Sequence, residues 1–162
     1  MSRAATPAIA ALVAAKVPHE VLRYAHDPRS ESYGDEAVAA LAGDSLVAEQ
    51  VFKTLVIASG SVLAVAVLPV PSKLSLKAAA AALGLSKVAM ADRAAAERST
   101  GYVLGGISPI GQRKRLPTVV DASALSYDRV LCSAGKRGWD VALAPQDLVR
   151  LTDAVTADIR AV

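Results

Sequence analysis

The chain has 162 residues, a net charge of +3 and a single cysteine. This length fits one domain over residues 1–162, with a core that needs no disulfide or metal to stabilise it. A single cysteine excludes an internal disulfide and a thiolate metal cluster, in agreement with a reducing cytoplasm. Hydrophobic residues make up 53% and aromatic residues only 4%, so we expect helices and small-residue packing. No apolar run approaches 18 uncharged residues, which argues against a membrane span.

The first half of the chain alternates between helical and extended patterns. A helix is predicted over 7–16 and a strand over 19–26, followed by a short helix that opens at 34–36 and runs to Leu41. Two apolar runs, 51–59 and 62–68, are separated only by a glycine-containing turn. They predict an antiparallel hairpin at the centre of a sheet.

The second half carries clear helix-boundary signals. Ser75 and Asp92 are predicted to cap helices that run to Leu83 and Arg98, and Asp121 to cap a brief helix. Pro145 suits the first position of a last helix over 146–155. Short strands are predicted over 102–104, 118–120, 130–133 and 140–143. This irregular interleaving predicts a single domain of the mixed α/β (α+β) class.

The most distinctive stretch is residues 98–117, RSTGYVLGGISPIGQRKRLP. Glycines let backbone N–H groups approach a ligand closely, and the basic residues that follow suit an anion such as the end of a nucleic acid. A phosphate-loop motif is excluded because Gln112 stands where that motif requires lysine. The predicted phosphate contacts are Arg113, Lys114, Arg115, Lys136 and Arg137; the alternative is a solvated basic face.

Lys53 is the strongest candidate for a functional side chain. It lies within the apolar strand segment VFKTLVI, on the face shared by Val51, Leu55 and Ile57. Burial of an unpaired ammonium is costly, so this lysine is expected to face a polar cavity or a partner. The alternative is an edge lysine whose stem reaches water.

The usual catalytic constellations are missing from the sequence. His19 and His26 lack metal-ligand spacing, no Gly-x-Ser-x-Gly elbow surrounds Ser108, and Cys132 lies in an apolar strand that predicts burial. We therefore expect neither a metal nor a cofactor. Any reaction would depend on positioning, backbone donors and groups of the substrate itself.

Four segments, in order and spacing, resemble the YbaK family of aminoacyl-tRNA deacylases. They are 33–36 (YGDE), 52–54 (FKT), 99–109 (STGYVLGGISP) and 133–138 (SAGKRG). The resemblance is strongest to free-standing cysteinyl-tRNA(Pro) deacylases, which are similar to the editing domain of bacterial prolyl-tRNA synthetases. It implies a single YbaK-like domain with a central mixed, mostly antiparallel sheet flanked by helices.

The resemblance also implies a mechanism and a site. The substrate's own thiol would attack the ester of Cys-tRNA(Pro), while Lys53 would hold carbonyl or phosphate oxygens of the aminoacyl-adenosine end. Asp140 would bind the α-ammonium group or the ribose, and the loop from Gly105 to Pro109 would present amide donors to the reacting carbonyl. The implied substrate-binding residues are Tyr24, Tyr33, Thr54, Gly105, Gly106, Ile107, Ser108, Pro109, Ser133 and Asp140.

The same resemblance suggests partners. It implies cysteine-charged tRNA(Pro) and prolyl-tRNA synthetase in a ternary assembly, with a monomeric, cytoplasmic enzyme. Ala134 and Trp139 depart from the residues common in relatives, which leaves pocket size open. Two alternatives remain: a deacylase of tRNAs charged with alanine, serine or another amino acid, and a non-catalytic module that binds a synthetase or tRNA.

Overall fold

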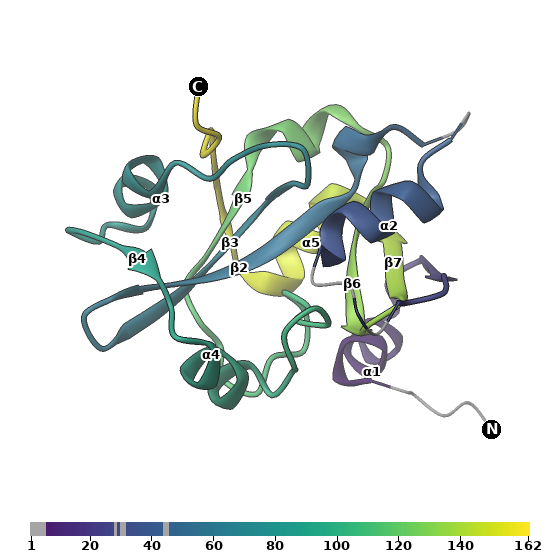
Figure 1. Ribbon diagram of the computed structural model, residues 1–162, viewed down its shortest axis with the longest axis horizontal. Coiled ribbons are helices and arrows are strands. Elements are labelled where there is room, and N and C mark those ends of the chain that lie inside the picture. Colours follow the sequence, from purple (N-terminus) through teal and green to yellow (C-terminus); the bar gives the residue numbers. More distant parts are fainter. Residues whose placement is uncertain (1–5, 28, 30–31, 44–45) are drawn as a thin grey trace.

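The computed structural model describes residues 6–27, 29, 32–43 and 46–162 (Figure 1). The helices are α1 (Pro7–Ala14), α2 (Tyr33–Leu41), α3 (Leu76–Leu83), α4 (Arg93–Thr100) and α5 (Pro145–Thr152), with 3₁₀ turns η1 (Ala48–Gln50) and η2 (Ala122–Ser126). The strands are β1 (His19–Arg23), β2 (Phe52–Ser59), β3 (Val62–Pro69), β4 (Ala89–Met90), β5 (Thr118–Asp121), β6 (Val130–Lys136), β7 (Trp139–Leu143) and β8 (Val155–Ala157).

The strands form two sheets that lie side by side in Figure 1. The five-stranded sheet has the order β4-β2-β3-β5-β8, antiparallel from β4 to β3 and parallel from β3 to β8. The three-stranded sheet, β1-β7-β6, is antiparallel throughout. An isolated bridge between Val51 and Leu131 joins the start of β2 to β6. The predicted mixed α/β class is confirmed, but two sheets replace the one central sheet because the β6–β7 hairpin pairs with β1.

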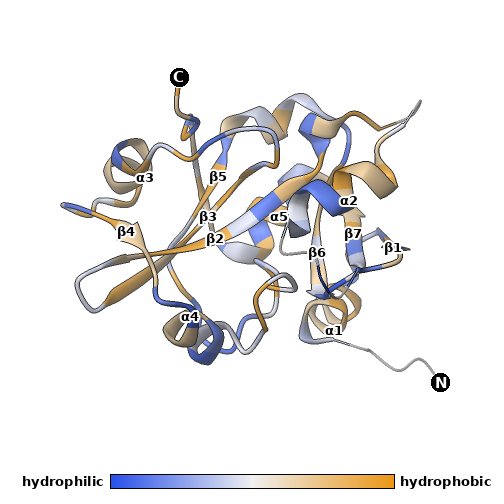
Figure 2. Ribbon diagram, in the orientation of Figure 1, coloured by the Kyte–Doolittle hydropathy of each residue, from blue (hydrophilic) through white to orange (hydrophobic). Residues whose placement is uncertain are grey.

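The β2–β3 hairpin is confirmed, and both of its faces are buried. Its register runs from Phe52 opposite Pro69 to Ser59 opposite Val62. Because side chains alternate along a strand, Val65 and Val67 belong to one core cluster, while Ala64, Ala66 and Leu68 pack in a second cluster that includes residues of α3. Figure 2 shows this hairpin as largely apolar. Burial on both faces makes it the rigid support of the molecule.

The predicted helix caps are observed. The Ser75 hydroxyl accepts the Ala78 amide at 3.1 Å, and an Asp92 carboxylate oxygen accepts the Ala95 amide at 3.2 Å. Each of these bonds satisfies an amide that has no partner inside the helix. Asp121 likewise accepts the Ser123 amide at the start of η2, at 3.1 Å.

Three predicted elements differ from the structure. Residues 102–104 form a loop rather than a strand, because the buried Tyr102 hydroxyl donates to the Ile110 carbonyl at 2.6 Å and folds the segment on itself. The last helix ends at Thr152, since Asp153 adopts a φ of 53°, and Val155 begins β8. Strand β1 ends at Arg23, short of the predicted limit of 26.

Within the described ranges, no helix is long and apolar enough to cross a membrane.

Candidate functional site

A cavity of about 80 Å³ lies where α2, the start of β2, the 105–107 loop and the β6–β7 hairpin meet. Its lining residues are Tyr24, Tyr33, Gly34, Ala37, Val51, Phe52, Lys53, Thr54, Val70, Gly105, Ile107, Ser133 and Asp140. The lining therefore includes Lys53 and most of the substrate-binding residues predicted from the sequence. Roughly one water-sized group fits in each 10–15 Å³ of such space, so the cavity has room for a small aminoacyl group.

Lys53 reaches into this cavity from β2. Its Nζ donates to the Ser72 carbonyl at 2.6 Å and to the Val70 carbonyl at 3.3 Å, both in the turn after β3. An ammonium group has three N–H donors, so one remains for a ligand. Burial lowers the pKa of Lys53, and the nearby negative charge of Asp35 opposes this shift. The sequence does not reveal the two carbonyl acceptors, because backbone groups carry no residue-type signal.

Asp140 contributes an unpaired carboxylate to the same cavity. It lies on β7 opposite Ser133 of β6 and is only 5% exposed. No hydrogen bond or ion pair joins its carboxylate to another residue in the described part of the chain. Burial raises the pKa of Asp140 from 3.8 to about 7. A buried carboxylate without a counter-ion is a suitable site for a ligand's ammonium group.

Further polar groups of the lining also lack partners. The Thr54 hydroxyl oxygen is fully buried and has no hydrogen-bond partner among the described residues. The amides of Gly105 and Ile107 donate to no acceptor in the same set of residues. Buried polar groups are nearly always paired in native proteins. These unpaired groups therefore point to a ligand that completes the site.

The aromatic wall of the cavity depends on a glycine. Gly105 has a φ of 88°, and a β-carbon at this position would lie 2.6 Å from two ring atoms of Tyr33. Only glycine satisfies both the backbone conformation and the contact. Tyr24 is the second tyrosine of the lining. Burial and the negative charge of Asp140 raise its pKa. Its hydroxyl stays protonated and can donate a hydrogen bond.

Three residues of the predicted binding loop do not line this cavity. Gly106 packs against the 136–137 turn, where a β-carbon would lie 3.0 Å from the Arg137 nitrogen. Ser108 is fully buried, and its hydroxyl accepts the Ile110 amide at 3.1 Å. Pro109 lines a different cavity. Neighbouring residues in this loop point in different directions, so only Gly105 and Ile107 face the Lys53 cavity.

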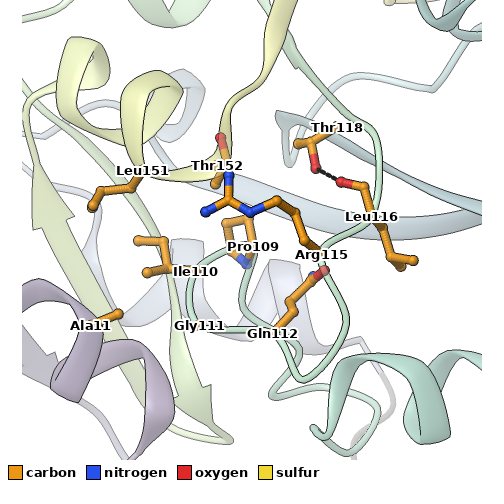
Figure 3. A pocket seen from close by; sticks show the side chains of 10 residues that line it. All are labelled: Ala11, Pro109, Ile110, Gly111, Gln112, Arg115, Leu116, Thr118, Leu151 and Thr152. Carbon is orange, nitrogen blue, oxygen red and sulfur yellow. Dashed lines mark hydrogen bonds between the residues drawn. The ribbon is translucent and has the colours of Figure 1, made fainter.

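The second cavity, of about 210 Å³, lies between α1, the end of α5 and the loop after Pro109 (Figure 3). Arg115 is among the side chains that line it, together with Gln112, Thr118 and Thr152. It is larger than the Lys53 cavity, but its lining contains no carboxylate, histidine or thiol. The smaller cavity, lined by Lys53 and Asp140, is therefore the candidate functional site.

The predicted RNA contacts do not form one uniform patch. Arg113, Lys114, Arg115 and Lys136 are exposed. Lys136 lies 4.9 Å from the centre of the Trp139 ring, which Arg23 also approaches. Arg137 differs because it is partly buried and bonded to the protein itself.

The described residues that line the Lys53 cavity include no cysteine and no histidine. Cys132 is fully buried on the opposite face of β6, where it packs in the cluster that contains α1, and burial raises its pKa. His19 is bonded to the Val17 carbonyl, and His26 to Glu36 at 2.7 Å. No group of potential metal ligands occurs in the described ranges. Ser133 is the one lining hydroxyl on β6, and it accepts the Gly135 amide at 3.1 Å.

The chain is a mixed α/β domain with a small cavity lined by Lys53 and Asp140, and the comparisons give its family. Residues 31–151 match the aminoacyl-tRNA editing domain. The chain therefore belongs to the aminoacyl-tRNA editing domain family, as the sequence motifs predicted. A relative, EbsC of Enterococcus faecalis, is 37% identical over 145 residues, which are 89% of this chain and 86% of EbsC. EbsC is assigned as a Cys-tRNA(Pro)/Cys-tRNA(Cys) deacylase.

Solved structures share the fold. A protein assigned as a trans-editing enzyme for prolyl-tRNA synthetase superposes with a TM-score of 0.80 at 24% identity, covering 100% of this chain and 99% of its own. A scaffold protein from a study of epitope backbone grafting by computational design has a TM-score of 0.83 at 23% identity, with the same coverage.

Proposed function

We propose that this protein deacylates mischarged tRNA and that its substrate is Cys-tRNA(Pro). The assigned activity of EbsC supports this substrate. The observation that carries the proposal is a small cavity lined by Lys53, which keeps a spare N–H, and by the unpaired carboxylate of Asp140. Its described lining contains no cysteine or histidine.

The groups of the cavity match an aminoacyl ester. The carboxylate of Asp140 binds the α-ammonium group of the amino acid, which restores the charge balance that burial removes. The third N–H of Lys53 donates to an oxygen of the ester or of the terminal adenosine. The amides of Gly105 and Ile107 donate to the carbonyl oxygen, where negative charge develops during ester cleavage.

The substrate supplies the nucleophile. The cysteinyl sulfur, as thiolate, attacks its own ester carbonyl, the bond to the ribose oxygen breaks, and that oxygen takes up a proton. The products are free tRNA and a cyclic thioester of cysteine, which water then opens to cysteine. Cys132 takes no part because it is fully buried on the other face of β6. The enzyme contributes position and electrostatic stabilisation.

Such an activity corrects an error that binding alone cannot prevent. A synthetase pocket discriminates a similar-sized amino acid by only about 1–3 kcal/mol per methylene group. A prolyl-tRNA synthetase therefore attaches cysteine to tRNA(Pro) at a measurable rate, and a second hydrolytic site removes it. Prolyl-tRNA synthetase and its tRNA are accordingly the proposed partners.

The decisive experiment measures release of the amino acid from tRNA(Pro) charged with cysteine, alanine, serine or proline. We expect rapid loss of cysteine only, and its abolition in Lys53→Met, which keeps the apolar stem and removes the ammonium. Lys73→Ala is the matched control, because Lys73 is an exposed lysine in the same turn region. Circular dichroism and the melting temperature establish that both variants fold.

Each outcome has a defined meaning. Cleavage of alanyl- or seryl-tRNA in preference to cysteinyl-tRNA would assign a different substrate to the same site. Saturable tRNA binding without ester loss would identify a binding module. Full activity in folded Lys53→Met would remove Lys53 from the mechanism. Activity that rises when prolyl-tRNA synthetase is added would support the ternary assembly.

A further inference from the structure

The loop that forms one wall of the Lys53 cavity is held from two sides at Leu104. The Leu104 amide donates to Glu97 of α4 at 2.7 Å, and the Leu104 carbonyl accepts from Nε of Arg137 at 2.7 Å. Arg93 supports Glu97 with a contact of 3.4 Å. The hydrogen bond from the Leu104 amide lowers the pKa of Glu97, so this anchor remains charged.

Arg137 also touches a second wall of the cavity. Its guanidinium carbon lies 5.0 Å from the centre of the Tyr33 ring, on α2. The ring of Tyr33 in turn packs against Gly105, where no β-carbon would fit. One side chain from the β6–β7 turn thus connects α2 with the residue just before Gly105. The backbone of the same turn leaves no room for a side chain at Gly106, where a β-carbon would lie 3.0 Å from the Arg137 nitrogen.

We infer that Arg137 is a positioning residue of the deacylase site, which holds the Leu104–Gly105 backbone and the Tyr33 ring in place rather than contacting tRNA phosphate. The inference rests on the proposed function only for its effect on turnover. The basic sequence KRG predicts instead that Arg137 contacts phosphate.

Two physical arguments favour positioning over phosphate contact. A phosphate that engaged Arg137 would have to compete with the Leu104 carbonyl and with the Tyr33 ring, and loss of either contact would disturb the cavity. The exposed residues Arg113 and Lys114 can bind phosphate without such a loss. Lysine cannot replace the arginine in this role, because an ammonium lacks the planar group that stacks on the ring while donating Nε–H.

The effect on catalysis follows from geometry. Gly105 and Ile107 line the cavity from this loop, and a shift of about 1 Å in groups that position a substrate can cost up to a hundredfold in rate. We expect Arg137→Gln and Arg137→Lys each to lower kcat roughly ten- to a hundredfold. Glu97→Ala, which removes the opposite anchor, is expected to give the same kind of loss.

The salt dependence of tRNA binding separates the two roles. A lost phosphate contact reduces the slope of log Kd against log salt by about one. We expect Lys114→Gln, which changes a predicted phosphate contact, to show this reduction. Arg137→Gln and Arg137→Lys should keep the wild-type slope while kcat falls. Wild-type kcat in Arg137→Lys, or a reduced slope in Arg137→Gln, would overturn the inference.

A measurement without substrate keeps the test independent of the proposed function. Amide hydrogen exchange across 103–107 should accelerate in Arg137→Gln, Arg137→Lys and Glu97→Ala. It should not accelerate in Lys114→Gln, compared at matched melting temperatures. If the wild-type protein releases no amino acid from any charged tRNA, the proposed function fails, while this measurement still decides whether Arg137 holds the loop. Unchanged exchange in Arg137→Gln would show directly that Arg137 does not hold this loop in place.

Discussion

Asp140→Asn should separate the stability of this protein from its activity. In the folded protein, burial raises the pKa of Asp140 from 3.8 to about 7. The folded state therefore holds a proton between pH 4 and 7 that the unfolded chain has released. Stability falls as pH rises through this window and becomes constant above it. Asparagine is uncharged at all these pH values and removes the penalty.

The structure bounds the size of this effect. A change from 3.8 to about 7 corresponds to about 4 kcal/mol, as an upper limit because the cavity admits water. For a chain of this size, 1 kcal/mol shifts the melting temperature by roughly 2–4 °C. We expect Asp140→Asn to melt up to about 16 °C higher than wild type at pH 8 and at nearly the same temperature at pH 4.

Melting curves between pH 4 and 8, followed by circular dichroism, test this expectation. Asp128→Asn removes an exposed carboxylate and controls for the change in net charge. The same Asp140 variant should lose about a hundredfold in kcat/KM for Cys-tRNA(Pro), because the α-ammonium group loses its counter-ion. If wild type and Asp140→Asn lose stability in parallel as pH rises, Asp140 is not the buried, uncompensated carboxylate described above.

Three other substitutions test the cavity and the proposed source of the nucleophile. Thr54→Val removes a buried hydroxyl that lacks a partner, so we expect a gain of about 1 kcal/mol in unfolding free energy with reduced turnover; a loss of stability on chemical denaturation would contradict this. Gly105→Ala places a β-carbon 2.6 Å from the Tyr33 ring at a φ of 88°, and it should cost about 1–2 kcal/mol or more and abolish deacylation; normal activity would show that the wall is not required. Cys132→Ala should cost about 1 kcal/mol and leave deacylation intact, whereas an inactive but folded variant would make the protein thiol the nucleophile.

Local sequence signals were sufficient for the elements whose bonds are local. The β2–β3 hairpin follows from two apolar runs around a tight turn, and the caps at Ser75 and Asp92 follow from side chains that bond to amides three residues away. Residues 102–104 are a counterexample. Their apolar composition predicts a strand, but the Tyr102 hydroxyl bonds to Ile110 and makes a loop.

The sequence likewise predicted only part of the candidate site. Sequence motifs identified the family and singled out Lys53, since a cation inside an apolar strand is unusual wherever the strand lies. The sequence could not show which residues of the GGISP segment face the cavity. Gly105 and Ile107 line it, whereas Gly106 packs on the 136–137 turn and Ser108 is buried elsewhere. That choice depends on the path of the loop between α4 and the β6–β7 hairpin.

By itself, therefore, the sequence determined the class of fold, the family and the cation at the centre of the site, because each rests on residue types and their local spacing. Tertiary structure decided how the strands divide into two sheets, why Asp140 has no counter-ion, and that Arg137 donates to the Leu104 carbonyl and lies over the Tyr33 ring. Those properties arise from residues brought together across more than 30 positions of the chain, as Leu104 and Arg137 are. That packing determines how strongly Asp140 is desolvated and which groups Arg137 contacts.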